Sequence, residues 1–359
     1  MEAFSARLPI ESRSAFARRV EERPKNSMTD SPILFCHFDN SRYLPYVLET
    51  ARLTNPDKPI ILLGDEKNRW IGPAKGIDHL LYRDFDYGHL IEQFDRLYRT
   101  VQGPLHRHMR GRVDWLKFVF KRWFYVYNFL VEHDHPSFWH FDSDTMVLVS
   151  LREHESKFDA YDCTEQCNGD CLNGFVPDAS FLLRFLNFIN VLFGDEAFLQ
   201  QKQRFFDEQE PTFSFNEMSA FAELKKRQTV KSIRLNTTID GSTFDDCLCQ
   251  EHGMEMERIF TEKEIKKVRC SDRGEFFCFD AESRESIRLN TLNLSWVPVE
   301  TFEVVSHQVK KCSEKLSTGP GKPIDQMPTI SELLWKQHFY SCLLGNLRAK
   351  TRSFRKRAH

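Results

Sequence analysis

The sequence contains no run of about 18 apolar residues, which is the length that a membrane-spanning helix needs. Its most apolar segment, residues 181–193, is interrupted by one arginine and two asparagines. The first 30 residues carry four glutamates and no apolar stretch, so they resemble neither a secretory signal nor an organelle transit peptide. The sequence therefore predicts a cytoplasmic protein.

A strong net charge is also absent. The formal net charge of the 359 residues is −2, so nothing draws the whole chain toward nucleic acid, and we expect no nucleic-acid partner. The C-terminal end differs, because no acidic residue follows Lys336 and six basic residues lie beyond Leu347. Such a tail can adhere to anionic lipid headgroups or remain a solvated terminus, and peripheral membrane contact is one prediction.

Ten cysteines are too few for a disulfide scaffold in a chain of this length. Three of them, Cys163, Cys167 and Cys171, recur every four residues, which on a helix would place them on one face as metal ligands. Asn-Gly pairs nearby favour a loop instead, and no fourth ligand follows at the usual spacing. We therefore predict free, partly buried thiols.

The first half of the chain alternates between strand and helix patterns. An apolar strand over residues 32–38 is followed by a helix over 43–53 and a second strand over 60–63, which together form a parallel βαβ unit. Two more strands of this half are expected over 77–82 and up to about residue 142, with helices over 87–98 and 114–133, the second of which Asp114 should cap. In the second half we expect a helix over 181–192, a helix capped by Asn216 and a turn-rich segment over 240–246. Strands over 276–279 and 287–294 and a terminal helix over 330–347 should follow. Between residue 150 and the late strands we expect loops and helices.

The fourth strand carries two carboxylates one residue apart, Asp142 and Asp144. A carboxylate within an apolar strand costs free energy unless a positive charge compensates it. At the end of a strand, the two side chains can offer oxygens to one hard divalent cation, which in turn binds phosphates. The alternative is a turn in which one aspartate caps the next element.

Arg122 lies on the apolar face of the helix expected over residues 114–133. An arginine in such a position usually extends its head group to water or pairs with a carboxylate. We predict that it is a partner for Asp142 or for a phosphate.

The order of these motifs resembles the GT-A glycosyltransferases, especially microbial nucleotide-sugar transferases of similar length, over about residues 31–300. The βαβ start resembles the family's nucleotide-binding strands, and Asp142-Ser143-Asp144 resembles its metal-binding Asp-X-Asp motif. The resemblance implies one large α/β domain, with a mixed, mainly parallel sheet flanked by helices and with terminal extensions. It divides the chain into an extension over 1–30, a transferase domain over 31–310 with halves at 31–150 and 151–310, a linker over 317–323, and a C-terminal helix and basic tail over 324–359.

The resemblance also implies roles for individual residues. Donor-binding positions are Cys36, Phe38, Asp65, Arg122, Asp142, Ser143 and Asp144. Acceptor-binding positions are Asn173, Gly174 and Asn216, and Glu217 takes the place of an active-site carboxylate. Asp142 and Asp144 would bind Mn²⁺ or Mg²⁺. Asn293 occupies the position where relatives carry a metal-binding histidine; His307 is a possible substitute or a surface residue.

The implied reaction moves a sugar from a nucleotide-diphosphate donor, such as a UDP-sugar, to a hydroxyl of a glycan or lipid-linked acceptor. An inverting reaction needs a base, for which Glu217 is the candidate, whereas a retaining one does not. A metal-dependent nucleotidyltransferase is a second interpretation, although a glycine-rich phosphate loop is lacking. A third is a non-catalytic sugar-binding descendant of a transferase, which the asparagine at position 293 favours.

Overall fold

The computed structural model describes residues 31–106, 113–259, 261–313 and 322–339. Its centre is a five-stranded sheet in the order β3-β2-β1-β4-β8. The strands are β1 (Ile33–Cys36), β2 (Ile60–Gly64), β3 (Asp78–Leu81), β4 (Phe138–Asp142) and β8 (Gly174–Val176). The first four strands of that order are parallel, and β8 runs antiparallel to β4. The predicted mixed, mainly parallel α/β fold is confirmed.

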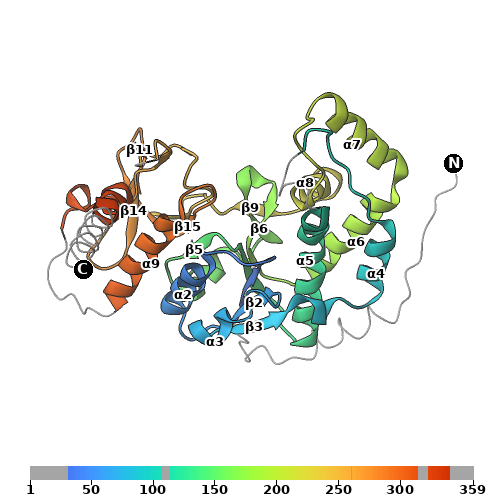
Figure 1. Ribbon diagram of the computed structural model, residues 1–359, viewed down its shortest axis with the longest axis horizontal. Coiled ribbons are helices and arrows are strands. Elements are labelled where there is room, and N and C mark those ends of the chain that lie inside the picture. The colour runs from blue at the N-terminus through green and yellow to red at the C-terminus, as the bar shows by residue number, and fades with distance from the viewer. Residues whose placement is uncertain (1–30, 107–112, 260, 314–321, 340–359) are drawn as a thin grey trace, which may run out of the picture.

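The sheet is buried on both faces, as apolar parallel strands require. Ile33 and Phe35 point into one core, and Leu34 and Cys36 point into the other. The first face is covered by α2 (Leu44–Thr54) and α3 (Ile71–Lys75), with α9 (Val299–Ser313) packed against α2. The second face is covered by α4 (His89–Leu97), α5 (Val113–Glu132) and α6 (Ser180–Gly194), as Figure 1 shows.

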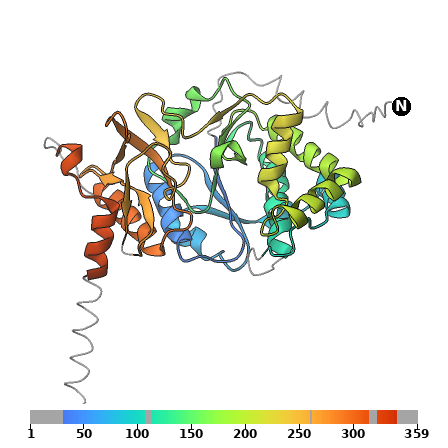
Figure 2. The same cartoon turned by 90° about the horizontal axis from the view of Figure 1, so that it is seen from above.

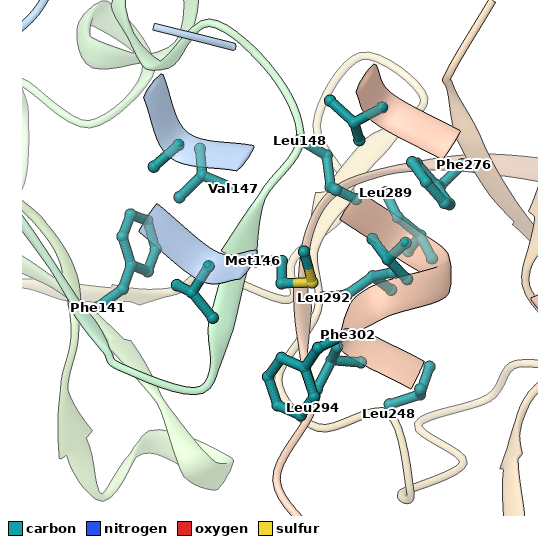
Figure 3. Packing of buried hydrophobic residues seen from close by; sticks show 14 of the residues in the cluster. Phe141, Met146, Val147, Leu148, Leu248, Phe276, Leu289, Leu292, Leu294 and Phe302 are labelled. Atoms are coloured by element: carbon teal, nitrogen blue, oxygen red, sulfur yellow. The ribbon is translucent and has the colours of Figure 1, made fainter. Parts of the chain in front are cut away.

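A second sheet extends the first core away from the central sheet. It contains β10 (Ser242–Phe244), β15 (Ser286–Asn293), β14 (Phe276–Phe279) and β13 (Arg269–Cys270), and β5 (Thr145–Val147) pairs with β15. Figure 3 shows Met146 of β5 beside its partner Leu292, within apolar packing that includes Phe302 of α9. The chain therefore leaves the central sheet at Asp142 and enters the second sheet at Thr145.

The remaining elements are two further helices, a set of short strands and a last helix. Helices α7 (Glu196–Glu208) and α8 (Glu217–Arg227) lie with α6 at one end, opposite the second sheet (Figures 1 and 2). The short strands are β6 (Cys163–Gln166), β7 (Cys171–Leu172), β9 (Ser232–Arg234), β11 (Met256–Arg258) and β12 (Glu264–Lys266). A last helix covers residues 330–339.

Two local predictions are wrong, and a third is incomplete. Asp114 does not precede the long helix, because α5 already begins at Val113. The segment over 240–246 begins with a turn, as predicted, but it also contains β10, which pairs in parallel with β15. The segment after the fourth strand includes a small sheet of β7, β6 and β9 rather than only loops and helices. These strands have two to four residues, too few to show an alternating pattern.

Several predictions fall outside the described residues. These are the extension over 1–30, most of the linker over 317–323, the end of the terminal helix beyond residue 339 and the basic tail. The predicted domain boundaries stay predictions. Within the described part of the chain, no helix combines the length and the apolar character needed to cross a membrane.

Candidate functional site

The candidate site lies where the order of the central sheet reverses. From β1 the chain passes to β2 and β3 on one side, and it later returns to place β4 on the other side. Ligands of open α/β sheets bind in the crevice outside the carboxyl ends of the strands at such a point. Cys36 and Asp142, the last residues of β1 and β4, are aligned in the parallel ladder. Asp142 therefore stands at the expected position for a ligand-binding group.

Arg122 of α5 connects two carboxylates at this point. Its Nη1 donates to Asp142 Oδ1 at 2.8 Å, and its Nη2 donates to Glu217 Oε1 at 2.9 Å. Burial alone would raise the pKa of Asp142, but the Arg122 charge and hydrogen bond outweigh it and hold that pKa below its usual value. Burial of the guanidinium would lower its pKa, but the charges of Asp142 and Glu217 outweigh this effect and raise that pKa above its usual value. The predicted pairing of Arg122 with Asp142 is confirmed.

Glu217 is the first residue of α8. Asn216 caps this helix by accepting a hydrogen bond from the Ser219 backbone N–H at 3.0 Å, as predicted. Burial raises the pKa of Glu217 from 4.5 to about 7; Arg122 opposes the shift and Asp142 adds to it. Among the described residues, Glu217 Oε2 is buried without a hydrogen-bond partner. This oxygen is therefore available to accept a proton or a ligand hydroxyl.

Asn173 holds the other oxygen of Asp142. Its Nδ2 donates to Asp142 Oδ2 at 3.1 Å, and its Oδ1 lies 2.8 Å from His140 Nδ1. Burial lowers the pKa of His140 to about 4, so this imidazole is neutral near pH 7. The next residue, Gly174, has φ +92°, and a Cβ there would lie 2.2 Å from Thr164 Oγ1. A larger residue at position 174 would displace the neighbouring Asn173.

Asp144 follows in the turn between β4 and β5. Its Oδ2 accepts the Ser295 hydroxyl at 2.8 Å, and its backbone carbonyl accepts the Leu294 N–H at 2.9 Å. Burial and the Asp142 charge raise the pKa of Asp144 to about 6. In the described part of the molecule, Asp144 Oδ1 is buried and lacks a hydrogen-bond partner. It is a fixed, unused acceptor.

The donor set suits a hard divalent cation. Asp144 Oδ1 is an unused carboxylate oxygen, and Asp142 lies two residues away. Mg²⁺ is commonly bound through one or two carboxylates, with substrate phosphates and water completing the shell. Asn293 is less well placed, since its Oδ1 accepts the Ser295 backbone N–H at 3.0 Å. Over residues 31–106, 113–259, 261–313 and 322–339, no group of three or more His, Cys, Asp or Glu side chains forms a metal site.

The other predicted donor-binding residues lie around the ends of β1 and β2. Ser143 Oγ lies 2.7 Å from His37 Nδ1, directly beyond β1. Asp65 accepts backbone N–H groups from Asp39 at 2.7 Å and from Lys67 at 2.8 Å, so it shapes the loops that follow β1 and β2.

Cys36 and Phe38 belong to the packing around these loops. Burial raises the pKa of the Cys36 thiol to about 12, so it stays protonated. The ring of Phe38 packs on Phe118, with centroids 5.2 Å apart. These contacts leave their predicted role in donor binding as a prediction.

The three regularly spaced cysteines do not share a helix. Cys163 begins β6, Cys167 lies in a 3₁₀ turn and Cys171 begins β7, and all three are free thiols. None of the three forms a disulfide in the described residues, and they do not share the helix face that a metal site would have used. His307 is exposed on α9.

Sequence reasoning missed three members of the site: His37, His140 and Ser295. The signal for Ser295 was its distance of two residues from Asn293, because alternate residues of an extended chain share a face. His37 directly follows β1 and His140 lies within β4, and both of these strands were predicted. Their contacts depend on which strands are neighbours, and a single sequence does not give that order.

No family model and no curated protein matches this chain. Several solved structures of glycosyltransferases resemble it weakly. Glycosyltransferase GlyE of Streptococcus pneumoniae has a TM-score of 0.30 at 13% identity, covering 58% of this chain and 45% of that chain. Mouse xyloside xylosyltransferase 1 has a TM-score of 0.35 at 10% identity, and the match covers 62% of this chain and 90% of that chain. The PaToxG glycosyltransferase has a TM-score of 0.29 at 11% identity, and the match covers 55% of this chain and 69% of that chain. The chain thus spans less than half the length of GlyE, and likenesses of this size carry no argument about activity.

Proposed function

We propose that this chain is a metal-dependent glycosyltransferase of the GT-A type, which transfers a sugar from a nucleotide-diphosphate donor to an acceptor hydroxyl. The observation that carries the proposal is the position of Asp142 and Asp144 at the reversal point of the sheet, with one buried carboxylate oxygen unused. This is where the fold class binds nucleotides, and the chemistry there suits a diphosphate held through a cation.

Asp142 and Asp144 would hold Mn²⁺ or Mg²⁺, which when bound neutralises the charge that develops on the leaving diphosphate. Asp144 is kept in place by Ser295, and Asp142 by Arg122 and Asn173. Asp144 is thus already positioned with one oxygen unused, whereas Asp142 would exchange one of its hydrogen bonds for the cation.

Glu217 is proposed as the base that accepts the proton of the acceptor hydroxyl. Its pKa of about 7 suits a base that works near neutral pH. Its hydrogen bond to Arg122 at 2.9 Å fixes one oxygen, and among the described residues the other oxygen has no hydrogen-bond partner. The acceptor itself is proposed to be a glycan or a lipid-linked saccharide.

A non-catalytic nucleotide-sugar-binding protein is the second candidate. Both oxygens of Asp142 already accept hydrogen bonds, from Arg122 and from Asn173, and this arrangement competes with metal binding. In such a protein the crevice would bind the donor without transferring its sugar.

A ligand screen by thermal unfolding tests donor binding, because a ligand that binds only the folded state stabilises it by mass action. With Mn²⁺ present, we expect at least one of a set of UDP- and GDP-sugars to raise the unfolding temperature, and Asp144→Ala to remove the rise. Asp57→Ala is the matched control, since Asp57 is exposed before the start of β2, at the opposite edge of the sheet. If no nucleotide sugar stabilises the wild-type protein, both candidates are wrong.

A further inference from the structure

Two cysteines share one turn close to the candidate site. The Gln250 N–H donates to the Cys247 carbonyl at 3.1 Å, which closes a turn over residues 247–250 with Cys249 inside it. Both cysteines are free, and the Cys247 thiol hydrogen-bonds to the sulfur of Cys249. A tight turn brings nearby Cα atoms together, as a disulfide requires. The geometry for a bridge between Cys247 and Cys249 is therefore present.

This cysteine turn is bonded to the end of the strand that supports the site. Leu248, labelled in Figure 3, is fully buried, and its N–H donates to the Asn293 carbonyl at 2.9 Å. The Cys249 thiol donates to the Ser295 carbonyl at 3.5 Å. Ser295 in turn donates its hydroxyl hydrogen to Asp144 at 2.8 Å. A change in the cysteine turn therefore acts on the residue that orients Asp144.

The two thiols differ in exposure and in acidity. Cys249 is half-buried, whereas Cys247 is buried beside it. The hydrogen bond from Cys247 lowers the pKa of the Cys249 thiol to about 7, against the effect of burial, and the charge of Lys263 also lowers it. The same hydrogen bond, together with burial, raises the pKa of Cys247. Because the thiolate is the reactive form, Cys249 is the thiol that reacts with an oxidant from solvent.

We propose that Cys247 and Cys249 are an oxidisable dithiol, which hydrogen peroxide converts into a disulfide. The Cys249 thiolate attacks one peroxide oxygen, the O–O bond breaks, and the hydroxide that leaves is protonated to water. Cys249 is then a sulfenic acid. The Cys247 sulfur attacks the Cys249 sulfur, the S–S bond forms as the S–O bond breaks, and the departing hydroxide takes the Cys247 proton as a second water. One peroxide is reduced to two waters while two thiols are oxidised.

The disulfide changes the contacts that lead to Asp144. It removes the hydrogen that Cys249 donates to the Ser295 carbonyl, and it draws the Cys249 sulfur toward Cys247. Because Leu248 is bonded to Asn293, a shift of the cysteine turn also reaches the end of β15. The oxidised protein therefore holds Asp144 less firmly, and its weaker binding of a nucleotide sugar rests on the proposed function. A partly exposed disulfide is readily reduced, so the change is reversible.

Peptide mapping of the full-length protein tests for the disulfide. After treatment with hydrogen peroxide, the protein is alkylated without reduction and cleaved with trypsin. Cleavage after Arg234 and Arg258 releases Cys247 and Cys249 in one peptide, residues 235–258. We expect this peptide to lose two hydrogen atoms and to escape alkylation, and dithiothreitol to restore both thiols. Cys249→Ser should abolish the loss.

Cys167→Ser is the matched control. Cys167 is also half-buried and hydrogen-bonded to a second thiol, that of Cys171, but both lie in another tryptic peptide, residues 158–184. In this variant the oxidation of peptide 235–258 should equal that of the wild type. The proposal is wrong if peroxide leaves both thiols of peptide 235–258 open to alkylation, if it oxidises Cys249 without linking it to Cys247, or if it forms a disulfide only in peptide 158–184.

Hydrogen exchange tests the effect on the site without any donor. The Leu294 N–H donates to the Asp144 carbonyl at 2.9 Å, and it should exchange about threefold to tenfold faster in the oxidised wild type but not in peroxide-treated Cys249→Ser. Unchanged exchange in a protein that carries the disulfide would contradict the link to Asp144. If no nucleotide sugar stabilises the reduced protein, the proposed function fails, while mapping and exchange still decide the dithiol.

Discussion

Ser295 donates its hydroxyl hydrogen to Asp144 at 2.8 Å, although 151 positions separate the two residues in the chain. The pairing of β5 with β15 brings them together, with Thr145 opposite Asn293. The bond occupies one carboxylate oxygen and leaves the other buried without a partner in the described residues. The second sheet therefore takes part in the candidate site, because it supplies the group that orients Asp144.

Removing this hydroxyl should weaken the site without unfolding the protein. Hydrogen bonds to charged groups contribute about 1.5–3 kcal/mol, so Ser295→Ala should lower kcat/KM for nucleotide-sugar turnover about tenfold to a hundredfold. Ser295→Thr keeps the hydroxyl and should retain most of the activity. Equal activity of the Ala variant and the wild type would show that Asp144 needs no such support.

Arg122 should be essential for stability, because it compensates two buried carboxylates. Arg122→Met should lower the free energy of unfolding at pH 7 by about 3–5 kcal/mol, as measured by urea denaturation. The loss should shrink toward pH 5, as protonation of the carboxyl groups relieves their burial. Arg184→Met is the control, because its ion pair with Asp162 is partly exposed, and its loss should cost less than about 1 kcal/mol.

Glu217 should control the pH dependence of turnover. A base must be deprotonated to act, and burial raises the pKa of Glu217 to about 7, so the rate should rise as the pH passes through 7. Glu217→Gln should lower the rate and remove this rise. If the rate of the variant rose with pH by the same factor and around the same pH as in the wild type, the titrating group would be another residue.

The raised pKa of Glu217 also makes the free energy of unfolding depend on pH. Between pH 4.5 and 7 the folded protein binds a proton at Glu217 that the unfolded chain releases. The contribution of Glu217 to the free energy of unfolding therefore falls as the pH rises across this window. Urea denaturation at several pH values should show a flatter pH dependence for Glu217→Gln than for the wild type.

A second buried ion pair supports the strand end that carries Ser295. Lys266 Nζ donates to Asp245 Oδ1 at 2.5 Å, and Asp245 Oδ2 accepts the Asn293 N–H at 3.0 Å. Lys266→Met should lower the free energy of unfolding by about 3–5 kcal/mol, because Asp245 is left buried and charged. Adding Asp245→Asn should recover part of the loss. An additive double variant would mean that the two side chains are energetically independent.

The sequence was sufficient for the elements that depend on local patterns. The apolar periods of 32–38, 43–53 and 60–63 predicted β1, α2 and β2, and Asn216 predicted the start of α8. The pairing of Arg122 with Asp142 was also predictable, because an arginine on a buried helix face needs an acid.

What could not be predicted depends on contacts between distant segments. The strands β6, β7 and β9 are held by pairing with one another rather than by their own periodicity. The bond between Arg122 and Glu217 joins α5 to α8, and the bond between Ser295 and Asp144 joins the two sheets. No local pattern specifies either neighbour. Glu217 was named only from the resemblance to a family, and Ser295 was not named.

The most direct test of the central claim is release of the nucleoside diphosphate from a set of UDP- and GDP-sugars, with Mn²⁺, by the wild type and by Asp144→Ala. In this assay water takes the place of the acceptor, so slow hydrolysis of the donor measures the activity of the same site even though the acceptor is not known. We predict measurable release by the wild type from at least one donor, and loss of that release in the variant. Tight binding of a donor without release would contradict catalysis and favour a binding protein, and release that Asp144→Ala leaves unchanged would contradict the site itself.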